Sequence, residues 1–306
     1  MAEHEIYFAT SGQMKQYKAK KIITQVLLYA FLTLIGLFIV LPFYYMIITS
    51  FKGTTAYDLE QSTGQLVLWL DKTNFSIEQY GKVLNKGGDF GVFYLNTVIV
   101  ATLSTAFTTV TTTFASFAFA RVDFKGKNFV FMILMATMMV PGEMMILTNY
   151  QTTMSLGWRN TFAALVLVHG VSVFYIFYLR QTFQQIPNEL FLAAKVDGYG
   201  HFQYLLKVMI PVASPTIVTI MILSLMGAWN AYVWPQLVAS GTNPVFGNDM
   251  HLVSNGLMAK FQSSDFSSDD PAKICGSMFA TVPLFVFFLI FRKYIMRGVS
   301  RSGIKG

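Results

Sequence analysis

Residues 187–215 read PNELFLAAKVDGYGHFQYLLKVMIPVASP and connect two apolar runs of the chain. Pro187 is suited to opening a helix, and Glu189 places an acid in the first turn, near the positive end of the helix dipole. Asp197 and Gly198 follow as a stop signal, because glycine readily adopts the positive φ of a helix C-cap. The first part of the segment therefore predicts a short helix between these two signals.

This short helix carries small residues, and a second helical stretch follows it. Ala193 and Ala194 are small, so the surface of another protein could approach the helix closely. A second helix is predicted at about His201 to Met209, and it leads to Pro211 at the start of the next apolar run. We interpret the whole segment as a helix-turn-helix; the plainer alternative is an ordinary loop.

The composition around this segment is that of a membrane protein. Of the 306 residues, 54% are hydrophobic and 12% are charged, whereas soluble domains carry about 25% charged residues. The net charge of +7 is spread between apolar runs rather than gathered on one basic face, which favours a membrane surface over a nucleic acid. The single cysteine, Cys275, excludes a disulfide framework or a four-thiolate metal site, and no metal site is expected.

Six apolar runs predict an all-α integral membrane protein. Each contains about 20 or more mostly apolar residues, enough to cross a hydrocarbon core of roughly 30 Å as a helix. The first run is too long for a cleaved signal peptide, and no small-residue cleavage site follows it. The predicted spans cover residues 22–49, 93–120, 128–149, 161–180, 208–235 and 274–294.

The distribution of basic residues predicts the orientation of the spans. With six spans both termini share one side, and that side holds 15 of the 22 Lys and Arg residues. The positive-inside rule therefore places both termini in the cytoplasm. This organisation gives a cytoplasmic segment 1–21, a first span with its outer loop at 22–92, a core with five spans and the 187–215 loop at 93–297, and a cytoplasmic tail at 298–306.

The 187–215 loop resembles the Glu-Ala-Ala loop of permease subunits of ABC importers, in which this triplet and a later glycine keep a fixed spacing. The resemblance extends along nearly the whole chain. Within the family, the chain is most similar to the carbohydrate-uptake branch, and it resembles the six-span permease subunit of the maltose system. Further residues carry it: Asn96-Thr-Val98, Ala118-Phe-Ala-Arg121, Phe124-Lys-Gly126, Trp229-Asn230, Trp234-Pro235 and Arg297-Gly-Val-Ser-Arg-Ser-Gly303.

The resemblance implies a type I importer permease fold in a bacterial or archaeal inner membrane, with several partners. These are two ATPase subunits that bind ATP and Mg, a second and non-identical permease, and an extracytoplasmic solute-binding protein that delivers a sugar or oligosaccharide. The chain itself has no phosphate-binding G-x-x-x-x-G-K-[ST] motif. It is therefore expected to be no enzyme and to hold no cofactor.

The resemblance also assigns the coupling of ATPase closure to the membrane helices to particular residues: Glu189, Ala193, Ala194, Asp197 and Gly198. Leu192 departs from the pattern, because it stands where the family has the Glu of the triplet. This replacement removes a charge-assisted contact to the ATPase. Glu189, one helical turn earlier, could substitute for it in part.

Polar residues within the predicted spans are candidates for the solute pathway, because they are costly in lipid. Glu143 follows a Pro-Gly pair that predicts a helix break, so it either faces the pore or is already wet at the outer interface. His169 is interpreted either as facing the solute or as forming an interhelical hydrogen bond. Trp229 and Asn230 could stack on and hydrogen-bond a sugar ring, whereas Trp234 suggests an interfacial aromatic belt.

Other classes of function are less compatible with the sequence. Glycerol-phosphate or another polar solute is the alternative within the same subfamily, but a phosphorylated solute favours pore-lining Arg or Lys, and none lies in the middle of a predicted span. A membrane enzyme should show clustered His, Glu or Asp at membrane depth. A secondary transporter, which needs no ATPase partner, would have no use for the 187–215 loop.

Overall fold

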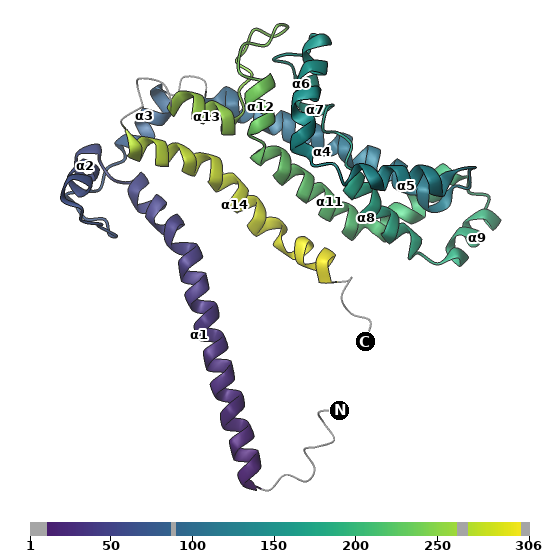
Figure 1. Cartoon of the computed structure of the whole chain (residues 1–306), viewed down its shortest axis with the longest axis horizontal. Helices are drawn as coiled ribbons and strands as arrows, with labels where there is room; N and C mark the ends of the chain where they lie inside the picture. Colours follow the sequence, from purple (N-terminus) through teal and green to yellow (C-terminus); the bar gives the residue numbers. More distant parts are fainter. Residues whose placement is uncertain (1–10, 87–89, 262–268, 301–306) are drawn as a thin grey trace. The chain divides into compact units, whose positions relative to one another are not determined.

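The computed structural model describes residues 11–86, 90–261 and 269–300, and the regular structure in these ranges is helical apart from two isolated β-bridges (Figure 1). This confirms the all-α prediction. In chain order the elements are α1 (Ser11–Ser50), α2 (Thr54–Thr63), α3 (Glu78–Lys86), α4 (Phe90–Arg121), α5 (Lys127–Thr137), the 3-10 turn η2 (Gly142–Met145), α6 (Ile146–Ser155), α7 (Phe162–Val166), α8 (Val173–Gln184), α9 (Asn188–Val196), α10 (His201–Tyr204), the π-helical turn η3 (Leu205–Met209), α11 (Ile210–Asn230), α12 (Val233–Val238), α13 (Val253–Phe261) and α14 (Asp270–Ser300).

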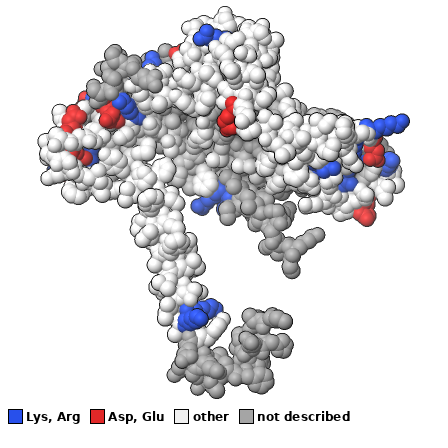
Figure 2. All heavy atoms as spheres, in the orientation of Figure 1, with Lys and Arg blue, Asp and Glu red and all other residues white. Residues whose placement is uncertain are grey.

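Four helices in the described part of the chain are long and apolar enough to cross a membrane, and a bent pair would make a fifth. The four are Tyr17–Ser50, Phe90–Arg121, His201–Asn230 and Asp270–Tyr294. Figure 2 shows few charged side chains over most of the displayed face, as expected for a surface in lipid. The count of six spans and the cytoplasmic placement of both termini stay predictions.

The third predicted span, 128–149, is not one continuous helix. α5 ends at Thr137, and the helices on either side of the break are bent by 89°. Pro141 causes the break, because proline has no N–H and fixes its own φ, here −58°. The helix break that the sequence predicted at this Pro-Gly pair is therefore confirmed.

The fourth predicted span, 161–180, is also broken, into α7 and α8. Ser172 caps α8, since its Oγ accepts a hydrogen bond from the Tyr175 backbone N–H at 3.3 Å. Gly170 lies in the connection against α4, where a Cβ atom would be only 2.1 Å from Cδ1 of Phe107. The close approach to α4 therefore depends on the missing side chain, a tertiary requirement that the apolar pattern of the span does not reveal.

The sequence predicted that the second helix of the 187–215 loop ends at about Met209, but the structure shows that it continues into the next apolar run. A single helix runs from His201 to Asn230. The π-helical turn Leu205–Met209 precedes Pro211. Proline offers no N–H to the residue four positions earlier, and its ring crowds that residue's carbonyl. The wider π turn accommodates this crowding, so the second helix of the loop and the following span form one continuous helix.

The chain divides into two compact units, which are described separately. The first comprises Met1–Gly81 and Asp269–Met278, and the second comprises Lys82–Ser268 and Phe279–Gly306. In the second unit one apolar core lies where α4, α8 and the α10–α11 helix meet, with members that include Phe117, Phe183 and Tyr204. This core gives the loop segment a fixed position relative to α4 and α8.

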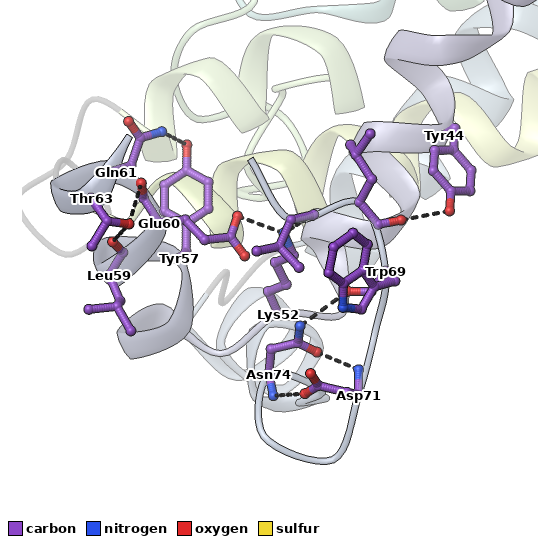
Figure 3. A network of polar contacts seen from close by, with 12 residues as sticks. Tyr44, Lys52, Tyr57, Leu59, Glu60, Gln61, Thr63, Trp69, Asp71 and Asn74 are labelled. Atoms are coloured by element: carbon purple, nitrogen blue, oxygen red, sulfur yellow. Dashed lines mark hydrogen bonds and ion pairs between the residues drawn. The ribbon is translucent and has the colours of Figure 1, made fainter. Parts of the chain in front are cut away.

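The first unit contains a buried ion pair between the connection that follows α1 and helix α2 (Figure 3). The side chain of Lys52 is fully buried, and its Nζ lies 2.7 Å from Oε2 of Glu60 and 2.6 Å from the carbonyl oxygen of Val67. The amide of Gln79 donates to the backbone carbonyl of Lys52 at 3.3 Å. These contacts organise the segment between α1 and α3 around the buried ammonium group of Lys52.

A turn in the same network closes the segment before α3 (Figure 3). Oδ1 of Asp71 accepts hydrogen bonds from the Thr73 backbone N–H at 2.8 Å and from the Asn74 backbone N–H at 3.0 Å. Hydrogen bonds from Thr73 and Asn74 lower the pKa of the Asp71 carboxyl below its usual value, because they stabilise the ionised form. The turn therefore stabilises the ionised form of the Asp71 side chain.

Candidate functional site

Helix α9 has the boundaries that the sequence predicted. It runs from Asn188 to Val196 with Pro187 at the N-cap, and Glu189 lies exposed in its first turn. Gly198 follows the C-cap with φ +78°, the left-handed conformation that glycine adopts without strain. The Tyr199 backbone N–H donates to the Ala194 carbonyl at 2.8 Å and thereby caps the last turn. Pro187 and Gly198 thus begin and end the helix as expected.

The two alanines of α9 lie on different faces, which corrects one part of the prediction. Ala193 is exposed, but Ala194 is only 5% exposed and belongs to the apolar core with Tyr204 and Phe183. Because i and i+1 positions on a helix face different directions, one alanine packs inward when the other faces out. Ala193 alone is therefore available for the close approach of another protein.

The outward face of α9 is apolar at the position where the resemblance implies an acid. Leu192 is 60% exposed and Val196, one turn later, is 88% exposed. Neighbours at i and i+4 form one continuous patch on a helix. Exposed apolar patches commonly mark protein interaction sites. At Leu192 this chain therefore offers an apolar contact instead of a charged one.

The inward face of α9 is held by aromatic contacts with the following helix. The ring of Phe191 packs edge-on against Tyr204 with centroids 5.0 Å apart and stacks on His201 at 5.9 Å. Tyr204 in turn lies 6.4 Å from Phe117 of α4. This chain of rings connects α9 to α4 and to the helix that runs from His201 to Asn230.

Arg121, the last residue of α4, connects three elements at this end of the second unit. Its Nη1 donates to Oδ1 of Asn188 at 2.5 Å, and its Nη2 donates to the carbonyl of Phe183 at 2.9 Å and to the carbonyl of Ile186. Those carbonyls lie at the C-terminal end of α8, where a positive charge is stabilised by the helix dipole. Charged side chains gather at the end of the unit where α9 lies (Figure 2).

We expect Arg121→Met to lower the unfolding free energy of the second unit by about 1.5 kcal/mol, because hydrogen bonds from a charged donor are lost and two carbonyls are left without this partner. Thermal unfolding of the detergent-solubilised chain measures the change. Lys125→Met, at an exposed position four residues later, serves as the control and should leave the midpoint unchanged. Equal midpoints for the two variants would contradict the structural role of Arg121.

A cavity in the second unit brings together part of the predicted solute pathway. Its volume is about 280 Å³, and residues of α4, α7, α8, α11 and α12 contribute to its walls. His169 lines it, and the His169 ring lies 5.0 Å from the ring of Trp234 in an edge-on arrangement. Ser104 and Ser224, which the sequence did not single out, also face the cavity. For Ser104 the available signal was Thr108, a second small polar residue one turn later on the same helix face, whereas Ser224 has no such neighbour.

The other three pathway candidates do not line this cavity. The indole N–H of Trp229 donates to the Ala280 carbonyl at 3.3 Å, and its ring packs edge-on to Tyr94. Asn230 and Glu143 are exposed and do not line the cavity. The aromatic-belt interpretation of Trp234 is wrong, because this ring is buried and its N–H donates to the Ala164 carbonyl at 3.0 Å.

Two polar residues at the start of α4 hold the segment 249–253, which contributes one residue to the cavity lining. Nδ2 of Asn96 donates to the carbonyls of Asp249 and His251, at 2.7 and 3.1 Å. Oγ1 of Thr97 accepts from the Val253 backbone N–H at 2.8 Å. Leu252, between these anchor points, lines the cavity. The Asn-Thr pair therefore positions one wall of the cavity.

The fold and these residues define a component of a membrane transporter. Residues 111–302, more than half of the chain, match the family described as the binding-protein-dependent transport system inner membrane component, and the chain belongs to this family. This confirms the family that the 187–215 loop suggested. Members of this family are permease subunits of ABC importers and not enzymes.

Characterised relatives cover most of the chain. A permease protein of an arabinooligosaccharide transport system from Halalkalibacterium halodurans is 26% identical over 91% of this chain and 94% of its own length. A lactose transport system permease from Rhizobium radiobacter is 28% identical over 87% and 92%. A trehalose/maltose transport system permease from Thermococcus litoralis is 24% identical over 94% and 99%.

A solved structure shows the same fold. It is a bacterial ABC transporter involved in the import of the acidic polysaccharide alginate, and the likeness has a TM-score of 0.74 at 21% identity. It covers 94% of this chain and 99% of the other chain. The arrangement of helices described above is therefore that of an ABC importer permease.

Proposed function

We propose that this chain is the permease subunit of an ATP-driven importer that moves a neutral sugar or oligosaccharide across a bacterial or archaeal inner membrane. The observation that carries the proposal is α9, a short helix with an exposed apolar face that is tied rigidly to α4 and to the α10–α11 helix. The names of the relatives, which include arabinooligosaccharide and lactose transport systems, support a sugar as the solute.

The proposal includes the partners that the resemblance implies. Two cytoplasmic ATPase subunits bind ATP and Mg, and one of them receives the face of α9 that carries Glu189, Leu192, Ala193 and Val196. A second, non-identical permease supplies the other docking helix, and an extracytoplasmic solute-binding protein delivers the sugar. When the ATPases close, α9 is displaced, and its aromatic contacts and Arg121 transmit the displacement to α4, α8 and α11.

A neutral solute is favoured over glycerol-phosphate by the cavity chemistry. None of the residues that line the cavity is Lys, Arg, Asp or Glu. Recognition of a phosphate group usually relies on Arg or Lys. The cavity offers hydroxyls and aromatic rings instead, which suit the alternating C–H and O–H surface of a sugar.

The experiment that tests coupling is Gly198→Val in the purified complex with its ATPase. A β-branched residue at φ +78° is strained by about 1–2 kcal/mol, so the turn after α9 should change. We expect sugar uptake and sugar-stimulated ATP hydrolysis in proteoliposomes to fall together.

The matched control is Gly200→Ala, two residues later. Gly200 has φ −76°, and an added Cβ meets no atom within 4 Å, so alanine fits there. Uptake and ATP hydrolysis should remain near the parent values. Unchanged coupling in Gly198→Val would argue against the role of this turn, and the importer proposal would be abandoned if no ATPase co-purified with the chain.

A further inference from the structure

Small residues spaced one helical turn apart on α4 and α11 line the cavity in the second unit. Ser104 and Thr108 are one turn apart on α4, so their side chains face the same side of the helix. Ser224 and Ala228 are one turn apart on α11, and Gly227 beside them leaves room. Small residues at these spacings on two packed helices create a space that larger side chains would fill.

The cavity contains an unused polar group. The Ser104 side chain is only 9% exposed, and its Oγ atom is buried without a hydrogen-bond partner among the described residues. A buried hydroxyl in that state costs free energy unless a ligand or water satisfies it. Because Ser104 lines the cavity, a change of its side-chain rotamer brings this hydroxyl to a ligand in the cavity.

The aromatic side chains that line the cavity are held by contacts with their neighbours. The hydrogen bond from the Trp234 indole N–H to the Ala164 carbonyl holds that ring in place, and the edge-on contact with His169 holds the second ring. Tyr175 adds a third aromatic side chain to the lining. A small-molecule site typically combines such apolar and aromatic walls with a few polar groups that orient the ligand.

Size and charge narrow the class of ligand. A volume of about 280 Å³ is close to the lower end of the roughly 300–1,000 Å³ range of small-molecule sites, so it suits a single ring better than a whole oligosaccharide. Since no Lys, Arg, Asp or Glu lines the cavity, a charged ligand would lose hydration without gaining a partner. A neutral, hydroxyl-rich ring fits both limits.

We propose that this cavity is a solute-binding subsite of the permease chain itself, which holds one neutral sugar ring between the aromatic wall of Trp234 and His169 and the hydroxyl of Ser104. The proposal rests on the proposed function and deepens it, because it places a solute contact in this subunit. The ring binds by packing its C–H face on the aromatic wall while its hydroxyl groups bond to the serine and threonine side chains.

A second groove in the same unit makes a useful contrast. Its lining is entirely apolar and includes Leu103, Ala106, Phe107 and Val110 on another face of α4. A surface of this kind suits lipid chains or another apolar helix and offers a sugar no hydrogen bond. A reporter at Ala106 therefore measures reagent access on α4 without measuring sugar binding.

The test uses a single cysteine reporter in the full complex. Cys275, the only cysteine, is replaced by alanine, and Ser224→Cys or Ala106→Cys is added. Labelling by a small thiol reagent is followed with maltose, lactose or arabinotriose present, and with glycerol 3-phosphate as an anionic probe. At ten times its Kd, a sugar that fills the cavity should slow labelling at 224 about tenfold. Labelling at 106 should not change.

A second variant separates a ligand contact from a packing role. Ser104→Ala should raise the KM of sugar uptake by about threefold to tenfold, the value of one neutral hydrogen bond, with the maximal rate unchanged. The affinity of the isolated solute-binding protein for the same sugar should stay the same, because that protein is not altered. Ser104→Thr, which restores a hydroxyl, should recover part of the loss.

The outcomes distinguish this inference from the proposed function. If a neutral sugar stimulates ATP hydrolysis by the complex but none slows labelling at 224, the subsite is overturned while the importer remains. Protection by glycerol 3-phosphate in place of the sugars would also overturn it. If no sugar stimulates ATP hydrolysis or uptake, the proposed function fails, and the subsite fails with it.

Discussion

Replacing Glu60 with alanine is expected to destabilise the segment between α1 and α3 by about 3–5 kcal/mol, the usual cost of leaving one partner of a buried ion pair uncompensated. The Nζ of Lys52 is fully buried and, among the described residues, would keep the Val67 carbonyl as its one remaining partner. An ammonium group held in that position loses far more hydration than one neutral hydrogen bond returns. The unfolding of this segment should therefore become much easier.

Hydrogen exchange of the backbone amides in the 53–81 range measures this change as a loss of protection. The double variant Lys52→Met with Glu60→Leu should recover most of it, because removing both charges leaves no unpaired charge in the interior. Asp123→Asn is the control, since Asp123 is fully exposed in its 3.8 Å pair with Lys127 and such pairs contribute about 0–1 kcal/mol. Equal exchange rates for Glu60→Ala and Asp123→Asn would show that the pair does not hold the segment.

Replacing Gly256 with valine is expected to destabilise the second unit by about 3 kcal/mol, at the upper end of the usual cost of overpacking a core. A Cβ atom at this position would lie 2.6 Å from Cδ2 of Phe93. Phe93 is fully buried between α13 and α4 and has little room to move away. The contact between these helices is therefore too close for any side chain at 256.

Thermal unfolding of the solubilised chain measures the loss, with Gly91→Ala on α4 as the control. At Gly91 an added Cβ meets no atom within 4 Å, so alanine should leave stability unchanged or raise it by about 0.5–1 kcal/mol. The milder Gly256→Ala, combined with Phe93→Leu, should lose less stability than the sum of the two single variants, because removing the phenyl ring at position 93 relieves the overlap with the added Cβ. Additive losses would show that the two residues do not conflict.

The boundaries of α9 illustrate what could be predicted locally. Pro187 and Gly198 act through their own backbone restrictions, which do not depend on distant residues. The break at Pro141 has the same origin. The two faces of α9 could not be predicted, because Ala193 and Ala194 are chemically identical and only the packing of Tyr204 and Phe183 decides which of them is buried.

The cavity could be predicted only in part. His169 was found because an imidazole within a span is unusual, whereas Ser104 and Ser224 are common residues in membrane helices and carried no such signal. Trp229 and Trp234 have the same side chain only five positions apart, yet one packs away from the cavity and the other forms its wall. The two residues differ because α11 ends at Asn230. Trp229 therefore lies on α11, whereas Trp234 lies on the separate helix α12.

The 187–215 loop shows where the two kinds of information divide. Residue types alone predicted the class of membrane component and the start and end of α9, because hydrophobicity and the backbone limits of proline and glycine are local properties, and the resemblance carried by this loop predicted the family. Tertiary structure decided that the second helix continues into α11, that the 161–180 run breaks against Phe107, and that hydroxyls from separate helices share one cavity. Those features depend on which surfaces meet, and residues far apart in the chain meet only after folding.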